Sequence, residues 1–275
     1  MMNLKKYFVL LFFALFCMTI SNQPAGSAES VSSSKFQSIL NSGKLRVGVA
    51  LFTPWVFKDK NGDLAGFEID VAEKLANDMG LKPNFSSYDW DNLIPALLRG
   101  EIDVIVSGMA ITPQRALKIN FSQPYATAGI NIATNVSLTE DIHGLEELNQ
   151  EKIKIGVVAE TVSEEFAEHL FEKAKIIKYK TSKEVEDDLV GAKIHVYMES
   201  KPIPRFIALE HPGKIDVPVG EPLLITKAGF AIKKGDPDFL NFLNSWIIAR
   251  ESDTWLNSIH DYWFKSLKWR KKYLP

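Results

Sequence analysis

Residues 102–115 read IDVIVSGMAITPQR, and this stretch decides the fold. Its first five residues form a near-continuous apolar run, which is typical of a strand buried on both faces of a parallel sheet. Thr112 is a favourable N-cap and Pro113 suits the first helical position, so a helix is expected to follow. A buried strand that passes through a short loop into a helix predicts an open α/β sheet.

Strand–helix alternation extends to both sides of this stretch. The upstream series has strands at 45–50 and 82–86 and helices at 67–79 and 90–98. After an extended segment at 130–134, the downstream series has strands at 154–158, 176–179 and 194–198 and helices at 164–173 and 183–190. No low-complexity linker separates the two series, so we expect an α/β protein of two lobes, each a doubly wound sheet, joined by extended segments.

The C-terminal part is helical at 237–249 and 252–264. Its tryptophans at 246, 255 and 263 occur at helical spacing, which is typical of core packing. Residues 265–275 are basic and aromatic, and we expect a solvated extension there.

The first 28 residues are typical of a secretory signal peptide. Lys5 and Lys6 precede an apolar run at 7–20, and the small residues at 25–28 favour cleavage after Ala28. The apolar run is about 14 residues, whereas a membrane span needs about 20. The only cysteine, Cys17, follows Phe16 rather than the small residue that lipid attachment requires. We therefore expect a periplasmic protein, in which cleavage removes two lysines and changes the net charge from −2 to −4.

Composition excludes several classes of function. The chain has 275 residues, of which 46% are hydrophobic and 24% charged, as in ordinary globular proteins. Basic and acidic residues number 32 and 34, so no nucleic-acid partner is predicted, and a monomer is the expected state. The five histidines lack metal-ligand spacing, and no phosphate loop, dinucleotide fingerprint or nucleophile elbow is present. No metal, cofactor or catalytic residue is predicted, and the sequence favours binding over turnover.

The loop after the buried strand is the first candidate site. Ser107, Gly108, Met109 and Ala110 lie where open α/β sheets bind ligands, at the carboxyl end of a strand. Free amides at a helix N-terminus favour an anion, and Arg115 adds a planar fork for a carboxylate. A surface arginine paired with an acidic residue is the alternative, and spacing alone leaves both open.

A second strand-to-helix loop, 159–163, offers Thr161 or Ser163 as helix cap. Two such loops could face each other across a cleft, although a purely structural cap is the simpler interpretation of this one. Phe52, Trp55, Phe57 and Trp90 could form a stacking wall or fill the lobe, and packing is expected for Phe57. Asp89, Asp91 and the acidic run 186–188 are interpreted as solvated charge.

Several motifs resemble those of the family 3 extracellular solute-binding proteins. They are LRVG at 45–48, PW at 54–55, GDLAGFEID at 62–70, WDNLIPAL at 90–97, GEID at 100–103, TPQR at 112–115 and FSQPY at 121–125. The resemblance extends over about residues 36–264. It implies a type II periplasmic-binding-protein fold with a two-strand hinge, one lobe at 29–128 and 228–275 and the other at 129–227. It also implies capture of a polar amino acid for delivery to an ABC permease.

The resemblance also implies roles for individual residues. Arg115 would hold the ligand's α-carboxylate, aided by the backbone at Ser107, Gly108 and Ala110 and by Thr161. Phe52 would stack on the ligand, and Trp90 would add a further wall.

The sequence departs from the family pattern at the position that would bind the ligand's α-ammonium. Ser200 lies where amino-acid-binding members have an aspartate, with Glu199 beside it, and Val162 and Ala110 replace common hydroxyl residues. If Glu199 turns inward, an amino acid fits; if it does not, a carboxylate without the amine is favoured.

The sequence leaves two other functions to consider. The cyclohexadienyl dehydratases resemble the same opening, but at the position of their general acid this chain has Ile203, which cannot donate a proton. A soluble partner of a receptor or redox system would use the same cleft, and the sequence does not distinguish it from a transport protein.

Overall fold

The computed structural model describes residues 34–265 and 268–274, and the chain from Lys35 onward forms one compact unit. The signal peptide predicted at 1–28 lies outside the described residues. Among the helices that are described, none has the length and apolar character needed to cross a membrane.

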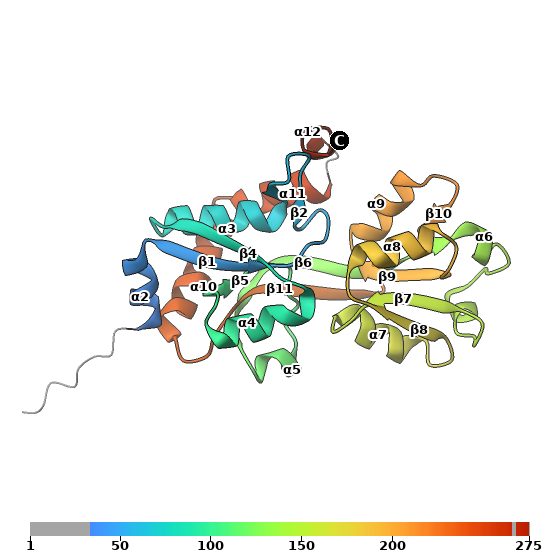
Figure 1. The fold of residues 1–275 in the computed structure, drawn as a ribbon, viewed down its shortest axis with the longest axis horizontal. Coiled ribbons are helices and arrows are strands. Elements are labelled where there is room, and N and C mark those ends of the chain that lie inside the picture. Colours follow the sequence, from blue (N-terminus) through green and yellow to red (C-terminus); the bar gives the residue numbers. More distant parts are fainter. Residues whose placement is uncertain (1–33, 266–267, 275) are drawn as a thin grey trace, which may run out of the picture. The chain divides into compact units, whose positions relative to one another are not determined.

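A mixed sheet of nine strands organises this unit (Figure 1). Its main path is β4-β1-β5-β11-β6-β9-β7-β8, and β10 pairs with β6. A separate hairpin is formed by β2 and β3. The strands are β1 (Lys44–Val49), β2 (Phe57–Lys58), β3 (Leu64–Ala65), β4 (Lys82–Ser87), β5 (Val104–Ile105), β6 (Asn120–Asn135), β7 (Lys154–Val158), β8 (Lys175–Tyr179), β9 (Val196–Ser200), β10 (Ile215–Asp216) and β11 (Leu224–Ile232).

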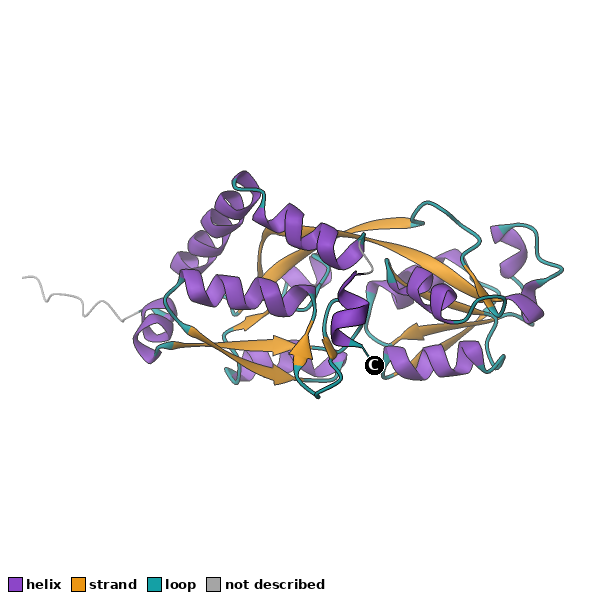
Figure 2. Cartoon of the chain, turned by 90° about the horizontal axis from the view of Figure 1, so that it is seen from above, coloured by secondary structure: helices purple, strands orange, loops and turns teal. Residues whose placement is uncertain are grey.

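Helices lie on both faces of this sheet (Figures 1 and 2). They are α2 (Lys35–Ser42), α3 (Phe67–Asp78), α4 (Leu93–Arg99), α5 (Pro113–Ala116), α6 (Val136–Thr139), α7 (Val162–Leu170), α8 (Ser182–Val190), α9 (Ile203–Glu210), α10 (Pro237–Ser252), α11 (Trp255–Phe264) and α12 (Lys268–Tyr273), with 3-10 turns η1 (Trp90–Asn92) and η2 (Leu145–Leu148). The predicted strand–helix alternation is confirmed, and α9 is an element that the sequence analysis did not predict.

Two long antiparallel strands, β6 and β11, connect the two halves of the sheet (Figure 2). At one end β11 pairs with β5, which continues in parallel to β1 and β4; this half is called the first lobe. At the other end β6 pairs with β9, which continues in parallel to β7 and β8; this half is called the second lobe. Only residues 130–134 of the 16-residue β6 were predicted, because Pro124 and the surrounding polar residues hide the strand pattern.

Each lobe has its own apolar core. In the first lobe α3, α10 and α11 pack on one side of the sheet, and α4 packs on the other. In the second lobe separate clusters form around Ile155 and around Tyr197. Core packing of the tryptophans is confirmed for Trp246 and Trp263, which are buried, while Trp255 is partly buried against the same cluster.

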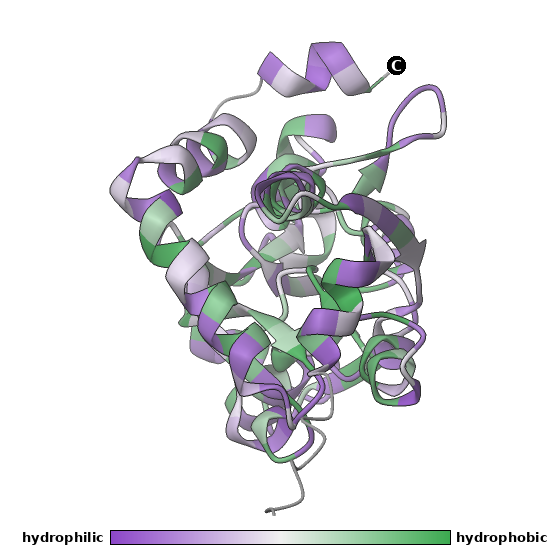
Figure 3. Ribbon diagram, turned by 90° about the vertical axis from the view of Figure 1, so that its left-hand side faces the viewer, coloured by the Kyte–Doolittle hydropathy of each residue, from purple (hydrophilic) through white to green (hydrophobic). Residues whose placement is uncertain are grey.

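The prediction of a solvated extension at 265–275 is wrong. Helix α12 packs onto the molecule, and the Trp269 side chain is only 1% exposed, in contact with Phe57, Trp263 and Phe206. Its lysines occupy the other side of the helix and make it largely hydrophilic (Figure 3). Composition alone therefore does not predict the buried aromatic face. Because Phe206 belongs to α9, this helix contacts elements of both lobes.

Candidate ligand-binding cleft

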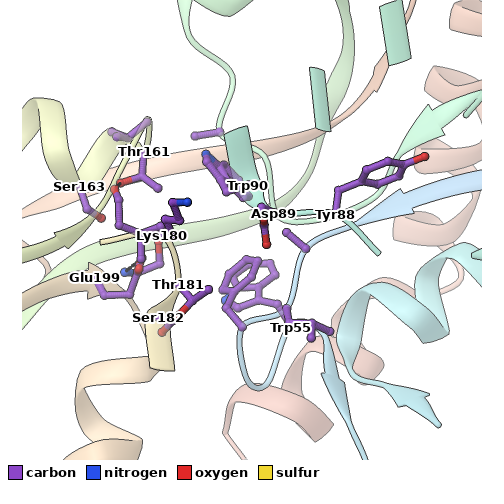
Figure 4. Close-up of a pocket in the computed structure, with 18 of the residues that line it drawn as sticks. Trp55, Tyr88, Asp89, Trp90, Thr161, Ser163, Lys180, Thr181, Ser182 and Glu199 are labelled. Carbon is purple, nitrogen blue, oxygen red and sulfur yellow. Dashed lines mark hydrogen bonds between the residues drawn. The ribbon is translucent and has the colours of Figure 1, made fainter. Parts of the chain in front are cut away.

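A cleft of about 610 Å³ lies between the two lobes, and side chains from both line it (Figure 4). In the figure Trp55, Asp89 and Trp90 face Thr161, Lys180 and Glu199 across the open space. The sequence-predicted residues that line this cleft are Phe52, Trp55, Trp90, Gly108, Ala110, Arg115, Thr161, Glu199 and Ser200.

Two predicted residues, Ser107 and Met109, lie beneath the lining rather than on it. Both are buried to 1% exposure. The Ser107 hydroxyl accepts a hydrogen bond from the Ala50 amide at 2.9 Å, and Met109 packs in the apolar cluster around α4. These two side chains therefore fix the position of the loop.

Gly108 lines the cleft in a backbone conformation that favours glycine. Its φ is +61°, and a Cβ at this position would lie 3.1 Å from the Trp55 ring and 3.2 Å from Phe52. Its backbone lies beside the buried Glu68 carboxyl and lowers the pKa of that group, against the effect of burial.

Arg115 is held at the cleft by the short helix α5. Thr112 caps this helix by accepting a hydrogen bond from the Arg115 amide at 3.3 Å, as the sequence predicted. The guanidinium donates to the Ala110 carbonyl at 3.0 Å and lies 5.5 Å from the centre of the Trp90 ring. Burial lowers the pKa of Arg115, and Glu165 and Glu160 oppose that shift, so the group stays cationic at neutral pH.

A hydrogen-bonded contact joins the lobes at Glu160. Its carbonyl oxygen accepts from Arg115 Nη2 at 2.9 Å and from Trp90 Nε1 at 3.0 Å. Glu160 adopts φ +59°, which is uncommon for a residue with a side chain and directs this carbonyl across the cleft. The next residue, Thr161, caps α7 by accepting from the Glu164 amide at 3.2 Å. Two hydrogen bonds thus connect the lobes beside the cleft, and the first-lobe cation Arg115 makes one of them.

Glu199 is the buried acid of the cleft. It lies on β9 on the same side as Tyr197, whose hydroxyl donates to its Oε2 at 3.1 Å, and the Ser200 amide donates to Oε1 at 2.6 Å. Burial raises the pKa of Glu199, and the hydrogen bonds from Ser200, Tyr197 and Ser163 oppose this shift. Glu199 is 6% exposed and lines the cleft, so its side chain turns inward.

The aromatic residues divide into wall and core. Phe52 stacks on Trp55 with ring centres 5.8 Å apart and meets the Trp90 ring edge-on at 6.1 Å, so these rings form a wall of the cleft. Phe57 instead packs against Trp263 and Trp269, which confirms its predicted place in the core.

The sequence analysis missed several cleft residues. Among them are the segment 180–183 of the second lobe, Ser163, which was considered only as a helix cap, and Asp89, which was interpreted only as solvated charge. The segment 180–183 follows β8 and opens α8, which is the strand-to-helix position that identified Arg115 and Thr161. The same rule applied to this third loop would have found it.

Two further groups lie outside the lining. Ile203 is 5% exposed and packs in the apolar cluster around Tyr197. Glu186, Glu210 and His211 place donor atoms within 4.8 Å of one another, but Glu210 is already paired with Arg270. Neither group adds a reactive side chain to the cleft.

The chain belongs to the bacterial extracellular solute-binding proteins, family 3, whose family model matches residues 45–266. Its fold is the two-lobed type II periplasmic-binding-protein fold. The L-cystine-binding protein TcyJ of Escherichia coli is 26% identical over 226 residues, which cover 81% of this chain and 83% of the relative.

Solved structures show the same fold over most of the chain. An ancestral amino-acid-binding protein, AncCDT-1, described as a precursor of cyclohexadienyl dehydratase, is 35% identical with a TM-score of 0.76, covering 84% of this chain and 99% of its own. A putative ABC-transporter binding component from Wolinella succinogenes, complexed with lysine, is 31% identical with a TM-score of 0.78, covering 83% and 99%.

Proposed function

We propose that this protein is a periplasmic solute-binding protein that captures an α-amino acid in its interlobe cleft and delivers it to an ABC permease. The observation that carries the proposal is the pairing of Arg115 and Glu199 across one cleft. They are a cation and a carboxylate from different lobes; Glu199 is buried and Arg115 is partly buried. A zwitterionic head group is the chemical complement of such a pair.

Arg115 would bind the ligand's α-carboxylate. Its guanidinium now donates to two backbone carbonyls, and a carboxylate is a stronger partner because charge-assisted, bidentate hydrogen bonds exceed neutral ones. Releasing the Glu160 carbonyl would cost one cross-lobe hydrogen bond, while Trp90 keeps its own bond to the same oxygen. Arg115 would then bind the ligand, while Trp90 would keep the hydrogen bond between the lobes.

Glu199 would accept the α-ammonium. A buried carboxylate without a cation is costly, which is the cause of its raised pKa. An ammonium group beside it would favour the ionised form and lower that pKa again. The Phe52 and Trp90 rings would cover the ligand's apolar part. Closure would bring the lobe at 129–227 against the lobe formed by 29–128 and 228–275 and exclude water from these contacts.

The comparisons support an amino acid as the ligand class. The curated relative binds L-cystine, one structural neighbour is complexed with lysine, and another is called an amino-acid-binding protein. The Wolinella protein is a putative component of an ABC transporter, which supports the transport role. Binding is favoured over dehydration because buried, apolar Ile203 offers no proton; formation of phenylpyruvate from prephenate by the purified protein would contradict this.

Calorimetric titration of ligand-free protein tests the proposal. Each amino acid is paired with its deaminated carboxylate, so that the α-ammonium is the only difference. Arg115→Met should abolish binding of both members of a pair, and Glu199→Gln should weaken the amino acid while sparing the deaminated acid. Arg205→Met, which changes an exposed arginine outside the cleft, is the control. Unchanged affinity in Arg115→Met, or binding of deaminated acids alone by the wild-type protein, would refute the proposed recognition.

A further inference from the structure

The cleft contains a second pair of opposite charges beyond the head-group site. Asp89 from the first lobe and Lys180 from the second both line it, and both are exposed (Figure 4). Among the residues that the structure describes, neither side chain forms a salt bridge. The two further basic residues of the lining are already paired, Arg99 with Glu101 and Lys183 with Asp187.

The two side chains belong to equivalent positions of the fold. Asp89 follows β4 and precedes η1, and its side chain does not cap that turn. Lys180 follows β8 and precedes α8, which is capped by Thr181 instead. Both therefore lie at the carboxyl ends of parallel strands, as Arg115 and Thr161 do. Their charges are not used by the secondary structure around them.

Resting on the function proposed above, we infer that the ligand carries two zwitterionic head groups joined by a short chain. Arg115 and Glu199 take one carboxylate and one ammonium, which leaves Lys180 for a distal carboxylate and Asp89 for a distal ammonium. The volume agrees with this, because about 610 Å³ lies within the range of roughly 300–1,000 Å³ for pockets that hold drug-sized ligands. A single amino acid would leave the outer part of the cleft to water.

The alternatives fit the charges less well. A cationic side chain would gain from Asp89 but be repelled by the Lys180 ammonium, and an anionic side chain would meet the reverse. An uncharged side chain would use neither group. Only a distal group with both charges satisfies the two residues together.

Calorimetric titration with four ligands of nearly the same carbon chain tests the inference. L-2-Aminoheptanoate has no distal charge, L-lysine has a distal ammonium, L-2-aminoheptanedioate has a distal carboxylate, and LL-2,6-diaminoheptanedioate has both. The last should bind at least tenfold more tightly than any of the other three. L-Cystine against L-methionine repeats the comparison with a disulfide linker, and absence of a tenfold preference for either two-headed ligand would overturn the inference.

Two variants assign the distal groups separately. Lys180→Gln should weaken the two ligands that have a distal carboxylate by about fivefold or more and leave L-lysine unweakened. Asp89→Asn should weaken the two that have a distal ammonium and leave L-2-aminoheptanedioate unweakened. Lys175→Gln, at the start of β8, and Asp91→Asn are matched controls that lie outside the lining.

The outcomes separate this inference from the proposed function. An equal loss for all four ligands would mean that Asp89 and Lys180 act on closure of the cleft and would overturn the inference. Equal binding of one-headed and two-headed ligands would also overturn it, while the amino-acid-binding function would stand. Absence of binding by every α-amino acid would instead refute the proposed function itself.

Discussion

Glu68 lies beneath the ligand loop and makes the stability of this protein depend on pH. The side chain is fully buried, and its Oε2 accepts from the Tyr125 hydroxyl at 2.7 Å. Its Oε1 has no hydrogen-bond partner among the described residues. Burial raises the pKa of Glu68 from 4.5 to about 8, although the hydrogen bond from Tyr125 and the Gly108 backbone oppose this shift. The carboxyl is therefore protonated in the folded protein at neutral pH.

The sign of the pH dependence follows from this raised pKa. Between pH 4.5 and about 8 the unfolded chain releases a proton that the folded protein keeps, so stability falls as pH rises. The slope is about 1.4 kcal/mol per pH unit in that window. Below pH 4.5 and above about pH 8 Glu68 contributes no further slope, because both states then have the same charge at this residue.

Glu68→Gln should remove this slope. Glutamine keeps the acceptor for Tyr125 and cannot ionise, although its amide nitrogen would replace the unpartnered oxygen at a fixed cost of about 1–3 kcal/mol. The difference in free energy of unfolding between variant and wild type should therefore increase by about 3 kcal/mol in favour of the variant from about pH 5 to pH 7.

Urea unfolding followed by tryptophan fluorescence at a series of pH values measures this difference. The exposed Glu172→Gln variant is the control, since it changes the same functional group in solvent. Because all other titrating groups are common to the two proteins, they cancel in the difference. Parallel stability curves for wild type and Glu68→Gln between pH 5 and pH 7 would refute a protonated, buried Glu68.

Three further predictions concern stability and the cleft. Trp269→Ala should destabilise by about 3–5 kcal/mol in urea unfolding, because the ring is buried between elements of both lobes; a loss below about 1 kcal/mol would mean that α12 is not docked in solution. Thr112→Ala should cost about 1 kcal/mol and also weaken amino-acid binding, since the cap positions Arg115; stability loss with unchanged affinity would confine Thr112 to a structural role. Gly108→Ala should lower the affinity for amino acids in calorimetry, because a Cβ at φ +61° would displace the Trp55 and Phe52 rings. Wild-type affinity would show that these rings can move without loss of binding.

Local patterns in the sequence determined much of the architecture. Strand–helix alternation and the helix start at Thr112 and Pro113 require only neighbouring residues, and both agree with the structure. The strand at 154–158 was predicted with the bounds that the structure gives. Arg115 and Thr161 could be placed at the carboxyl ends of strands by the same local logic, and the structure brings both to the cleft.

Other features depended on contacts between distant segments. Strands β6 and β11 are long because they pair with each other across about 100 residues of sequence, not because either has a strong strand pattern. Helix α12 is docked because Trp269 finds Phe57 and Phe206, although its own composition favours solvent.

Contacts between distant segments also decided which cleft residues the sequence could not predict. In the sequence alone, a charged residue such as Asp89 or Lys180 is expected to face solvent. Only the tertiary structure shows that it lines the cleft and has no ion-pair partner. Glu199 could be counted as a ligand only once the pairing of β9 placed it on the side of Tyr197. Sequence determined the elements and their order through local periodicity and capping, whereas burial, charge pairing and orientation toward the cleft were decided by long-range packing.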